Sequence, residues 1–174
     1  AFGASPRMRF DIVLNNLSGL AYTTGRIAMT SDGSPWRPLV HGLDIGKAIR
    51  CALTAPRESI HAQVFNVGSD EQNYQVRDIA ERVAKAFPGC ETSFGPPSAD
   101  NRSYRVSFAK ISSQLPGFSC DWDADRGAAQ LAEVFGRIKL DDATFSGRGH
   151  TRLKQLEHLL ATEQLDPDLF WTYS

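Results

Sequence analysis

A few polar side chains in conformationally restricted positions are the residues of this sequence best suited to contact a ligand. Arg37 lies between Trp36 and Pro38, directly after a Gly-Ser-Pro turn, and the planar guanidinium of arginine matches a phosphate group. A surface arginine stacked on Trp36 is the alternative. Asn15 and Asn16 interrupt an apolar helical pattern, where asparagine is disfavoured because its side chain competes for backbone hydrogen bonds. Each asparagine therefore either faces solvent or has a function.

Two further groups of polar residues extend this set. Asn66 stands near the end of an apolar segment, where open α/β sheets place their ligands, but an asparagine that ties down the adjacent loop would look the same. Arg102, Tyr104 and Arg105 follow a loop rich in proline and glycine. They suit a phosphorylated ligand that carries a ring, and a surface basic cluster is the alternative. The residues alone therefore indicate, at most, an α/β protein with a site for an anionic small molecule.

Several common catalytic and cofactor sites have no motif in this sequence. We find no glycine-rich dinucleotide loop or P-loop and no GxSxG nucleophile motif. The adjacent acidic residues at 141–142 are typical of a solvated turn beside a helix. The histidines lack cysteine or carboxylate partners at metal-ligand spacing, so we expect no metal site; they are His41, His61, His150 and His158.

Composition narrows the class of protein further. The chain has 174 residues, of which 41% are hydrophobic and 22% charged, with a formal net charge of −1. This is a globular composition, and it argues against a strongly basic nucleic-acid binder. No apolar run is long enough to span a bilayer, and we recognise no signal peptide. Three widely spaced cysteines without a CxxC motif indicate reduced thiols. We therefore expect a cytoplasmic protein that binds neither nucleic acid nor membrane.

Alternating helical and strand patterns must position these residues. The segment 63–68 is a compact apolar run, typical of a strand inside a sheet that is covered on both faces. Asp44 stands where it could cap a helix that carries Ile49 and Leu53 on its apolar face, and Pro56 ends that helix. The alternation predicts an α/β fold. The predicted helices lie at about 10–21, 44–55, 74–87, 109 onward, 123–138 and 153–160, and the strands at 26–30, 38–42, 63–68 and 90–94.

The order of the motifs resembles a known family. "FGASPRMR", a helix with Asn-Asn, "SDGSPWRPLVHGLDIGKAI", "QVFNVGSDEQNYQVRDIAERVAKAF" and "DNRSYRVSFAKI" follow one another as in the C-terminal half of the NAD-dependent epimerase/dehydratases. These are extended short-chain dehydrogenases/reductases that act on nucleotide-activated sugars. The resemblance covers about residues 1 to 135. It implies an α/β fold that is the C-terminal portion of an extended Rossmann-type, doubly wound fold, with the small substrate-binding lobe and without the N-terminal NAD-binding part.

The resemblance also assigns roles to residues and regions. Residues 1–140 would form the substrate-binding portion, and 141–174 a helical C-terminal extension. Phe2 and Gly3 would lie beside the nicotinamide of NAD, the implied cofactor. The nucleotide-sugar substrate would meet the remaining residues: Asn15 and Asn16 at the sugar diphosphate, Arg37 at a nucleotide phosphate, Asn66 in the supporting strand, and Arg102, Tyr104 or Arg105 at the nucleotide end.

The catalytic motifs of that family are absent. Its acid/base is the tyrosine of Tyr-x-x-x-Lys, but Tyr22, Tyr74, Tyr104 and Tyr173 all lack a lysine four residues on. The resemblance therefore implies the substrate-binding portion of an isomerase or lyase that is inactive without an upstream Rossmann part. A stand-alone, non-catalytic binding or assembly module derived from the family is the alternative. If the chain is such a portion, we expect self-association, or pairing with the missing part, because apolar surface would be left uncovered. Which sugar and nucleotide are bound is left open.

Overall fold

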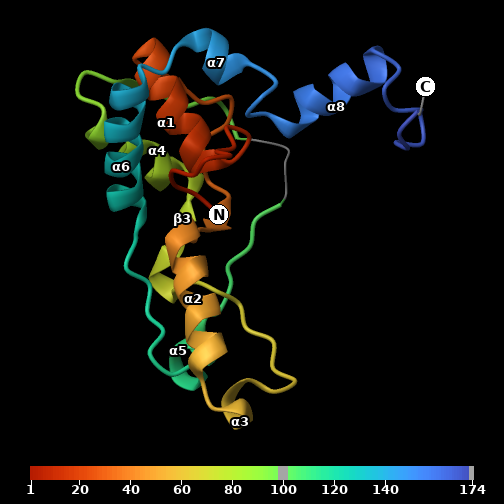
Figure 1. Cartoon of the computed structure of the whole chain (residues 1–174). Coiled ribbons are helices and arrows are strands. Elements are labelled where there is room, and N and C mark those ends of the chain that lie inside the picture. Colours follow the sequence, from red (N-terminus) through yellow and green to blue (C-terminus); the bar gives the residue numbers. More distant parts are fainter. Residues whose placement is uncertain (98–101, 173–174) are drawn as a thin grey trace.

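The structure is a computed structural model that describes residues 1–97 and 102–172 (Figure 1). A group of helices forms the main body, an elongated arm extends from it, and the last helix projects to one side. The elements are α1 (Val13–Thr24), β1 (Arg26–Ala28), β2 (Trp36–Pro38), α2 (Gly42–Thr54), α3 (Arg57–Ile60), η1 (Asp70–Gln72), β3 (Asn73–Gln75), α4 (Val76–Ala86), β4 (Glu91–Ser93), α5 (Ala109–Gln114), α6 (Ala124–Ile138), α7 (Asp142–Ser146) and α8 (Arg152–Ala161).

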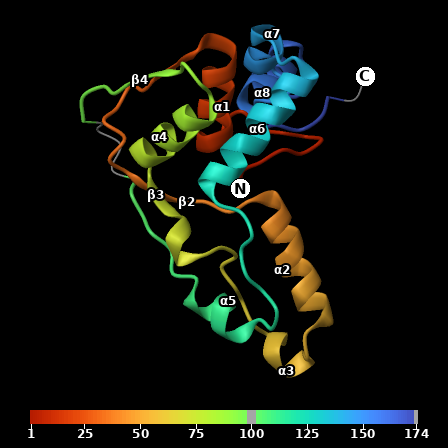
Figure 2. The ribbon, with the colours of Figure 1, turned by 90° about the vertical axis from the view of Figure 1, so that its left-hand side faces the viewer.

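Helices α1, α4 and α6 pack against one another to form the main hydrophobic core (Figure 2). The spacing of Ile79 and Val83 predicted the buried face of α4, and both side chains are fully buried. Leu131 and Phe135 fill the same core from α6. The predicted stop of the first helix is also confirmed, because Gly25 takes the left-handed conformation that glycine adopts readily at a helix C-terminus.

The strands are short and form two separate pairs. β1 pairs in parallel with β4, with Arg26 opposite Glu91, within the two segments predicted as strands at 26–30 and 90–94. β2 pairs antiparallel with β3, with Trp36 opposite Gln75. The strand predicted at 38–42 is therefore displaced, because β2 ends at Pro38 and His41 already caps the following helix.

The prediction of a buried strand at 63–68 is wrong. The segment belongs to no strand, and Val64 is 81% exposed. A strand requires a neighbouring backbone to satisfy its N–H and C=O groups, and no strand within residues 1–97 and 102–172 pairs with this segment. Its apolar composition therefore does not place it inside a sheet.

The N-terminus of α2 also differs from the prediction. His41, not Asp44, is the N-cap residue, and its Nδ1 accepts a hydrogen bond from the Leu43 backbone N–H at 3.1 Å. Asp44 lies one turn further on and is 1% exposed. Its two carboxylate oxygens accept hydrogen bonds from the backbone N–H groups of Asp121 at 2.9 Å and Trp122 at 3.2 Å. Asp44 thus joins α2 to the segment that precedes α6.

A second, smaller core lies between α2 and α5. Ala48 and Cys51 pack with Ile111 of α5, with Leu115 just after that helix, and with Phe108 just before it. The apolar face expected for α2 is only partly buried, since Leu53 is 81% exposed and Ile49 is also exposed. The helix is amphipathic as predicted, but the described residues do not cover all of its apolar side chains.

The C-terminal region contains one helix that the sequence pattern did not predict. α7 begins after Asp141, whose carboxylate caps the helix by accepting a hydrogen bond from Thr144 N–H at 2.7 Å. Phe145 of α7 is buried against Phe10, with ring centroids 4.9 Å apart. α8 then leads away from the main body (Figure 1), and the segment after it exposes Phe170 and Trp171.

His41 occupies the junction between the two cores. Its ring stacks on Trp122 at a centroid distance of 4.0 Å and meets Phe2 edge-on at 5.1 Å. Because Nδ1 accepts from Leu43, the proton of the neutral ring is on Nε2, which donates to Gln130 Oε1 at 2.9 Å. Burial lowers the pKa of His41 more than the Gln130 hydrogen bond and the Asp44 carboxylate raise it.

We expect His41 to make folding less favourable in mild acid. The unfolded chain binds a proton at this position below about pH 6.5, whereas the buried ring resists protonation. The free energy of unfolding should therefore be highest above that pH and fall as the pH drops from about 7 to about 5. Urea unfolding across this range measures the slope, and His41→Asn, which retains a capping acceptor, should flatten it. An unchanged slope in this variant would contradict the assignment.

Candidate functional site

A cavity of about 370 Å³ opens beside β2 and contains two of the predicted site residues, Phe2 and Arg37. Its wall is mainly aliphatic, and Arg37 contributes the only charged side chain among its described lining residues. An apolar wall with few polar groups is typical of a small-molecule site. The lining residues are Ala1, Phe2, Ile12, Val13, Leu14, Arg37, Pro38, Leu39 and Val76.

Arg37 is held by backbone carbonyl groups. Its Nη1 donates a hydrogen bond to the Trp36 carbonyl at 2.8 Å and another to the Arg102 carbonyl. The guanidinium also lies 5.7 Å from the centroid of the Tyr104 ring. Another arginine, Arg105, lies over the Trp36 ring, with its guanidinium 4.7 Å from the ring centroid. These contacts give Arg37 a defined orientation at the edge of the cavity.

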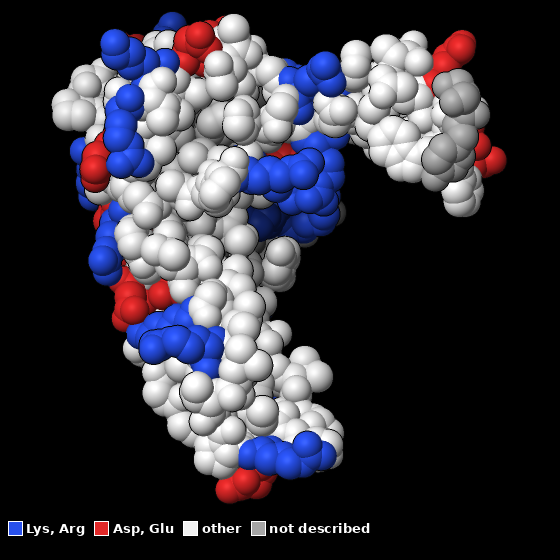
Figure 3. Space-filling model, viewed as in Figure 1, with Lys and Arg blue, Asp and Glu red and all other residues white. Residues whose placement is uncertain are grey.

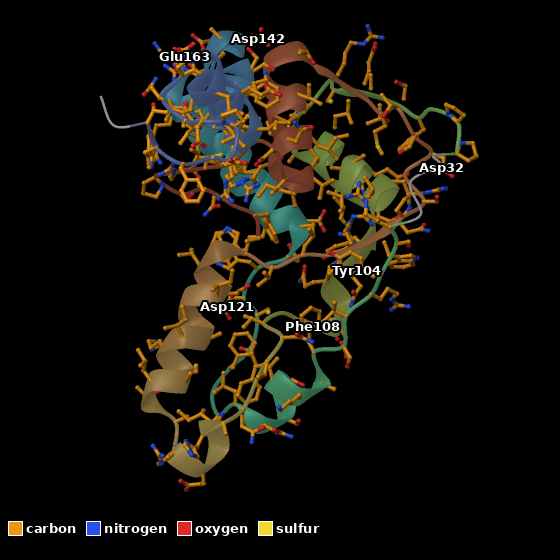
Figure 4. The ribbon with its side chains drawn as sticks, turned by 90° about the vertical axis from the view of Figure 1, so that its right-hand side faces the viewer. Asp32, Tyr104, Phe108, Asp121, Asp142 and Glu163 are labelled. Atoms are coloured by element: carbon orange, nitrogen blue, oxygen red, sulfur yellow. The ribbon has the colours of Figure 1, made fainter. Side chains whose placement is uncertain are left out.

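The structure brings the 102–105 cluster to the same place. The Trp36 backbone N–H donates to Ser103 Oγ at 3.0 Å, and Tyr104 N–H donates to the Trp36 carbonyl at 3.4 Å. Figure 4 shows Tyr104 on the extended segment that leads from the side of β2 towards Phe108 and α5. Arg37, Arg102, Tyr104 and Arg105 thus form one basic and aromatic cluster, which joins Arg37 to the three residues that the sequence grouped. Residues 98–101 of the predicted loop lie outside the described residues.

Asn15 and Asn16 bind the backbone that precedes their helix. Asn15 is 1% exposed, so the alternative of a solvent-facing side chain is wrong for this residue. It accepts a hydrogen bond from Gly3 N–H at 3.0 Å and donates to the Arg9 carbonyl at 3.0 Å. Asn16 donates to the Phe10 carbonyl at 2.9 Å. Both amides therefore shape the loop at 3–10, and contact with a diphosphate stays a prediction.

Phe2 and Gly3 are packed against other parts of the same chain. The Phe2 ring is buried against His41 and Gly127. Gly3 has a φ of +103°, and a Cβ atom there would lie 2.0 Å from His41 Nε2, so this position requires glycine. Both backbone N–H groups are already hydrogen-bonded, that of Phe2 to the Val40 carbonyl at 2.9 Å and that of Gly3 to Asn15 Oδ1 at 3.0 Å, so neither is left to hold a pyrophosphate group. A position of these residues beside the nicotinamide stays a prediction, and we derive no reaction step through NAD.

Asn66 lies outside the Arg37 cavity. Its side chain is exposed and donates a hydrogen bond to the Ser107 carbonyl at 3.4 Å. It lines a smaller cavity of about 200 Å³ that shares Pro38 and Leu39 with the Arg37 cavity. Asn66 therefore lines the cavity next to the Arg37 cavity, and Pro38 and Leu39 border both. Asn66 is neither buried nor at the end of a strand.

A further cavity, of about 420 Å³, was not anticipated from the sequence. It lies between the loop that precedes α1 and the start of α8, and four arginines line it. The available signal was the repetition of cations in "SPRMR" and "GRGHTR". The two stretches are so far apart in sequence that only the tertiary structure shows them to be neighbours.

Metal binding and membrane insertion find no support in the described part of the chain. Within residues 1–97 and 102–172, no group of three or more histidine, cysteine, aspartate or glutamate side chains is arranged to hold a metal ion. No helix among the same residues has the length and apolarity needed to cross a membrane.

The fold and the cavity define a mixed α/β protein in which an arginine from a short strand faces an apolar pocket. Residues 3–68 match the sequence model of the NAD dependent epimerase/dehydratase family. This matched range contains Asn15, Arg37 and Asn66, together with Gly3.

Solved structures with the same fold include enzymes of that kind. An NAD-dependent NDP-hexosamine 5,6-dehydratase, TunA, involved in tunicamycin biosynthesis, matches with a TM-score of 0.61 at 19% identity over 78% of this chain and 44% of that one. The UDP-glucuronic acid 4-epimerase from Bacillus cereus, in complex with UDP-glucuronic acid and NAD, gives 0.62 at 17% identity over 79% and 43%. The present chain thus spans less than half the length of these structures.

A similar fold also occurs in an enzyme that is neither an epimerase nor a dehydratase by name. L-threonine dehydrogenase from Phytophthora infestans matches with a TM-score of 0.62 at 15% identity, over 80% of this chain and 46% of that one. At such identities the likeness shows only that this chain shares its fold with part of these enzymes, and it leaves the ligand of this chain to be argued from its own residues.

Proposed function

We propose that this chain is the substrate-binding portion of an NAD-dependent nucleotide-sugar epimerase or dehydratase. Residues 1–140 would form the substrate-binding part, and 141–174 the helical C-terminal extension. The family match over 3–68, and a fold that corresponds to less than half of each similar enzyme, support this assignment. The glycine-rich loop, the Tyr-x-x-x-Lys pair and the contacts to NAD would belong to sequence outside these residues, so the chain by itself would bind without catalysing.

The geometry of Arg37 carries the proposal. Two carbonyl groups orient its guanidinium beside an apolar cavity, and an oriented guanidinium can donate two parallel hydrogen bonds to a phosphate. Tyr104 and the Arg105–Trp36 pair extend this edge with aromatic and cationic groups. A nucleotide sugar requires both components: cations for its diphosphate, and apolar or aromatic surface for its rings.

Exposed apolar residues support pairing with another polypeptide segment. Leu43, Ile49 and Leu53 of α2 and Val64 of the segment that follows α3 are all exposed, and large exposed apolar patches are usually covered in soluble proteins. We propose that these side chains contact the missing Rossmann part or a second copy of the chain.

Nucleotide-sugar binding tests the proposal directly. We expect UDP-, GDP- or dTDP-sugars to bind the chain in isothermal titration calorimetry. Arg37→Ala should weaken that binding by about tenfold or more, because it removes a charge-assisted hydrogen bond to phosphate. The affinity of Arg37→Lys should lie between those of the unmodified chain and Arg37→Ala, since lysine keeps the positive charge but lacks the planar, two-pronged guanidinium donors.

Arg50→Ala is the matched control, because Arg50 is an exposed arginine of α2 outside the cavity. It should bind like the unmodified chain. If none of the three classes of nucleotide sugar binds, and Arg37→Ala behaves like the unmodified chain, the proposed function is wrong.

A further inference from the structure

The 420 Å³ cavity between the loop before α1 and the start of α8 concentrates positive charge in a chain that is not basic overall. Arg7, Arg9, Arg148 and Arg152 all line it, together with His150, while the whole chain has a formal net charge of −1. None of its lining residues is acidic. Figure 3 shows Lys and Arg gathered in the hollow between the main body and the projecting C-terminal segment.

Hydrogen bonds hold the two walls of this cavity together. Phe10 N–H donates to the His150 carbonyl at 3.0 Å, and His150 Nδ1 donates to the Met8 carbonyl at 3.1 Å. Asp11 accepts two hydrogen bonds from the Arg9 guanidinium, at 2.7 and 2.8 Å. The pKa of Asp11 is lowered, first by Arg9 and also by the backbone amide of Arg152, so this carboxylate contacts both walls. The cavity is therefore a formed site with a defined frame.

Most of the cationic charge is left for a ligand. Asp11 compensates Arg9, and among the described residues Arg148 donates to the neutral Gln155 Oε1, at 2.8 Å, and to no carboxylate. The exposed guanidinium groups of Arg7 and Arg152 contact no carboxylate within residues 1–97 and 102–172. Three arginines of like charge in one cavity repel each other unless an anion enters. Their planar donors match phosphoryl oxygens in charge and geometry.

We propose that this cavity binds a diphosphate group through Arg7, Arg148 and Arg152. The positive charge of three uncompensated guanidinium groups exceeds the negative charge of a single phosphate monoester, and it matches that of a diphosphate. The cavity shares none of its lining residues with the Arg37 cavity. The proposal is therefore independent of the function proposed above. The diphosphate could be free pyrophosphate or part of a nucleoside diphosphate.

Calorimetric titration with inorganic pyrophosphate tests this site. We expect binding that weakens as salt is added, and we expect R7A/R152A to weaken it by about a hundredfold, or tenfold for each charge-assisted hydrogen bond that is removed. Both side chains are exposed, so the fold should persist, and far-UV circular dichroism checks this. R50A/R137A removes the same charge from exposed positions outside the cavity and should leave the affinity within twofold.

The outcomes separate the possible explanations. Absence of pyrophosphate binding would overturn the proposal. Equal weakening of that binding by R7A/R152A and R50A/R137A would also overturn it, because it would show only general charge attraction. UDP serves as the second probe. If R7A/R152A loses the binding of both UDP and pyrophosphate, and Arg37→Ala still binds pyrophosphate, the cavity is supported as a site for a diphosphate, either free or in a nucleoside diphosphate. Nucleotide-sugar binding that depends on Arg37 is scored separately, so either proposal can fail alone.

Discussion

Asp44→Ala is expected to lower the free energy of unfolding by about 3 to 5 kcal/mol, because each of two partly buried backbone N–H groups loses a charged acceptor worth about 1.5 to 3 kcal/mol. The N–H groups are those of Asp121 and Trp122. They lie in the segment that connects the second core to α6, and after the substitution neither has a replacement acceptor on the alanine. For a chain of this size the melting temperature should fall by about 2 to 4 °C for each kcal/mol of destabilisation.

Urea unfolding followed by circular dichroism measures this effect, and Asp121→Ala is its control. The Asp121 side chain pairs with Lys47 at 2.8 Å on the surface, so its removal should cost less than about 1 kcal/mol. Asp44→Asn keeps one acceptor oxygen and should fall between the two. A loss below about 1 kcal/mol for Asp44→Ala would show that the two N–H groups find other partners.

Phe135→Ala should destabilise the main core by about 3 to 5 kcal/mol, the usual cost of deleting a large buried aromatic side chain. Phe135 is fully buried, and its ring lies 5.8 Å from the ring centroids of both Phe10 and Tyr22. The cavity would open where α1 and α6 meet, and close-packed interiors relax only partly around such a space. Because domains are stable by only about 5 to 15 kcal/mol, much of the folding free energy would be lost.

The matched control lies on the same helix. Ile138→Ala removes an apolar side chain that is 55% exposed, so we expect a change within about 1 kcal/mol. Thermal and urea unfolding of both variants give the comparison. Similar losses at the two positions would mean that Phe135 does not occupy a closely packed core.

The helices of the body could be predicted because their signals are local. Apolar residues three and four apart define the buried faces of α4 and α6, and Gly25 marks the end of α1. The short strands at 26–28 and 91–93 also followed from nearby residues. These features depend on backbone preferences and on one buried face, and a sequence window of a few turns contains that information.

The candidate site was predictable in its residue types but not in its contacts. The stiff setting of Arg37 and the grouping of Arg102, Tyr104 and Arg105 indicated an anion site, and the structure places them together. Residues about 65 positions apart had to meet before Arg37 could donate to the Arg102 carbonyl and Arg105 could lie over Trp36. The sequence could not show these contacts, because they depend on which segment lies alongside β2.

Local sequence thus determined the longer helices, the end of α1 at Gly25, and which cations and aromatic groups are available for an anion, while the short helices α3 and α7 were not predicted. The tertiary structure decided how those groups are used. It gave the helix cap to His41 and turned Asp44 towards residues 121 and 122; it left 63–67 without a strand partner, and it joined residues 7–9 to residues 148–152 around one cavity. The physical reason is the same in each case. Folding decides which groups become neighbours of each hydrogen-bonding atom, strand edge and charged side chain. These neighbours come from distant parts of the chain.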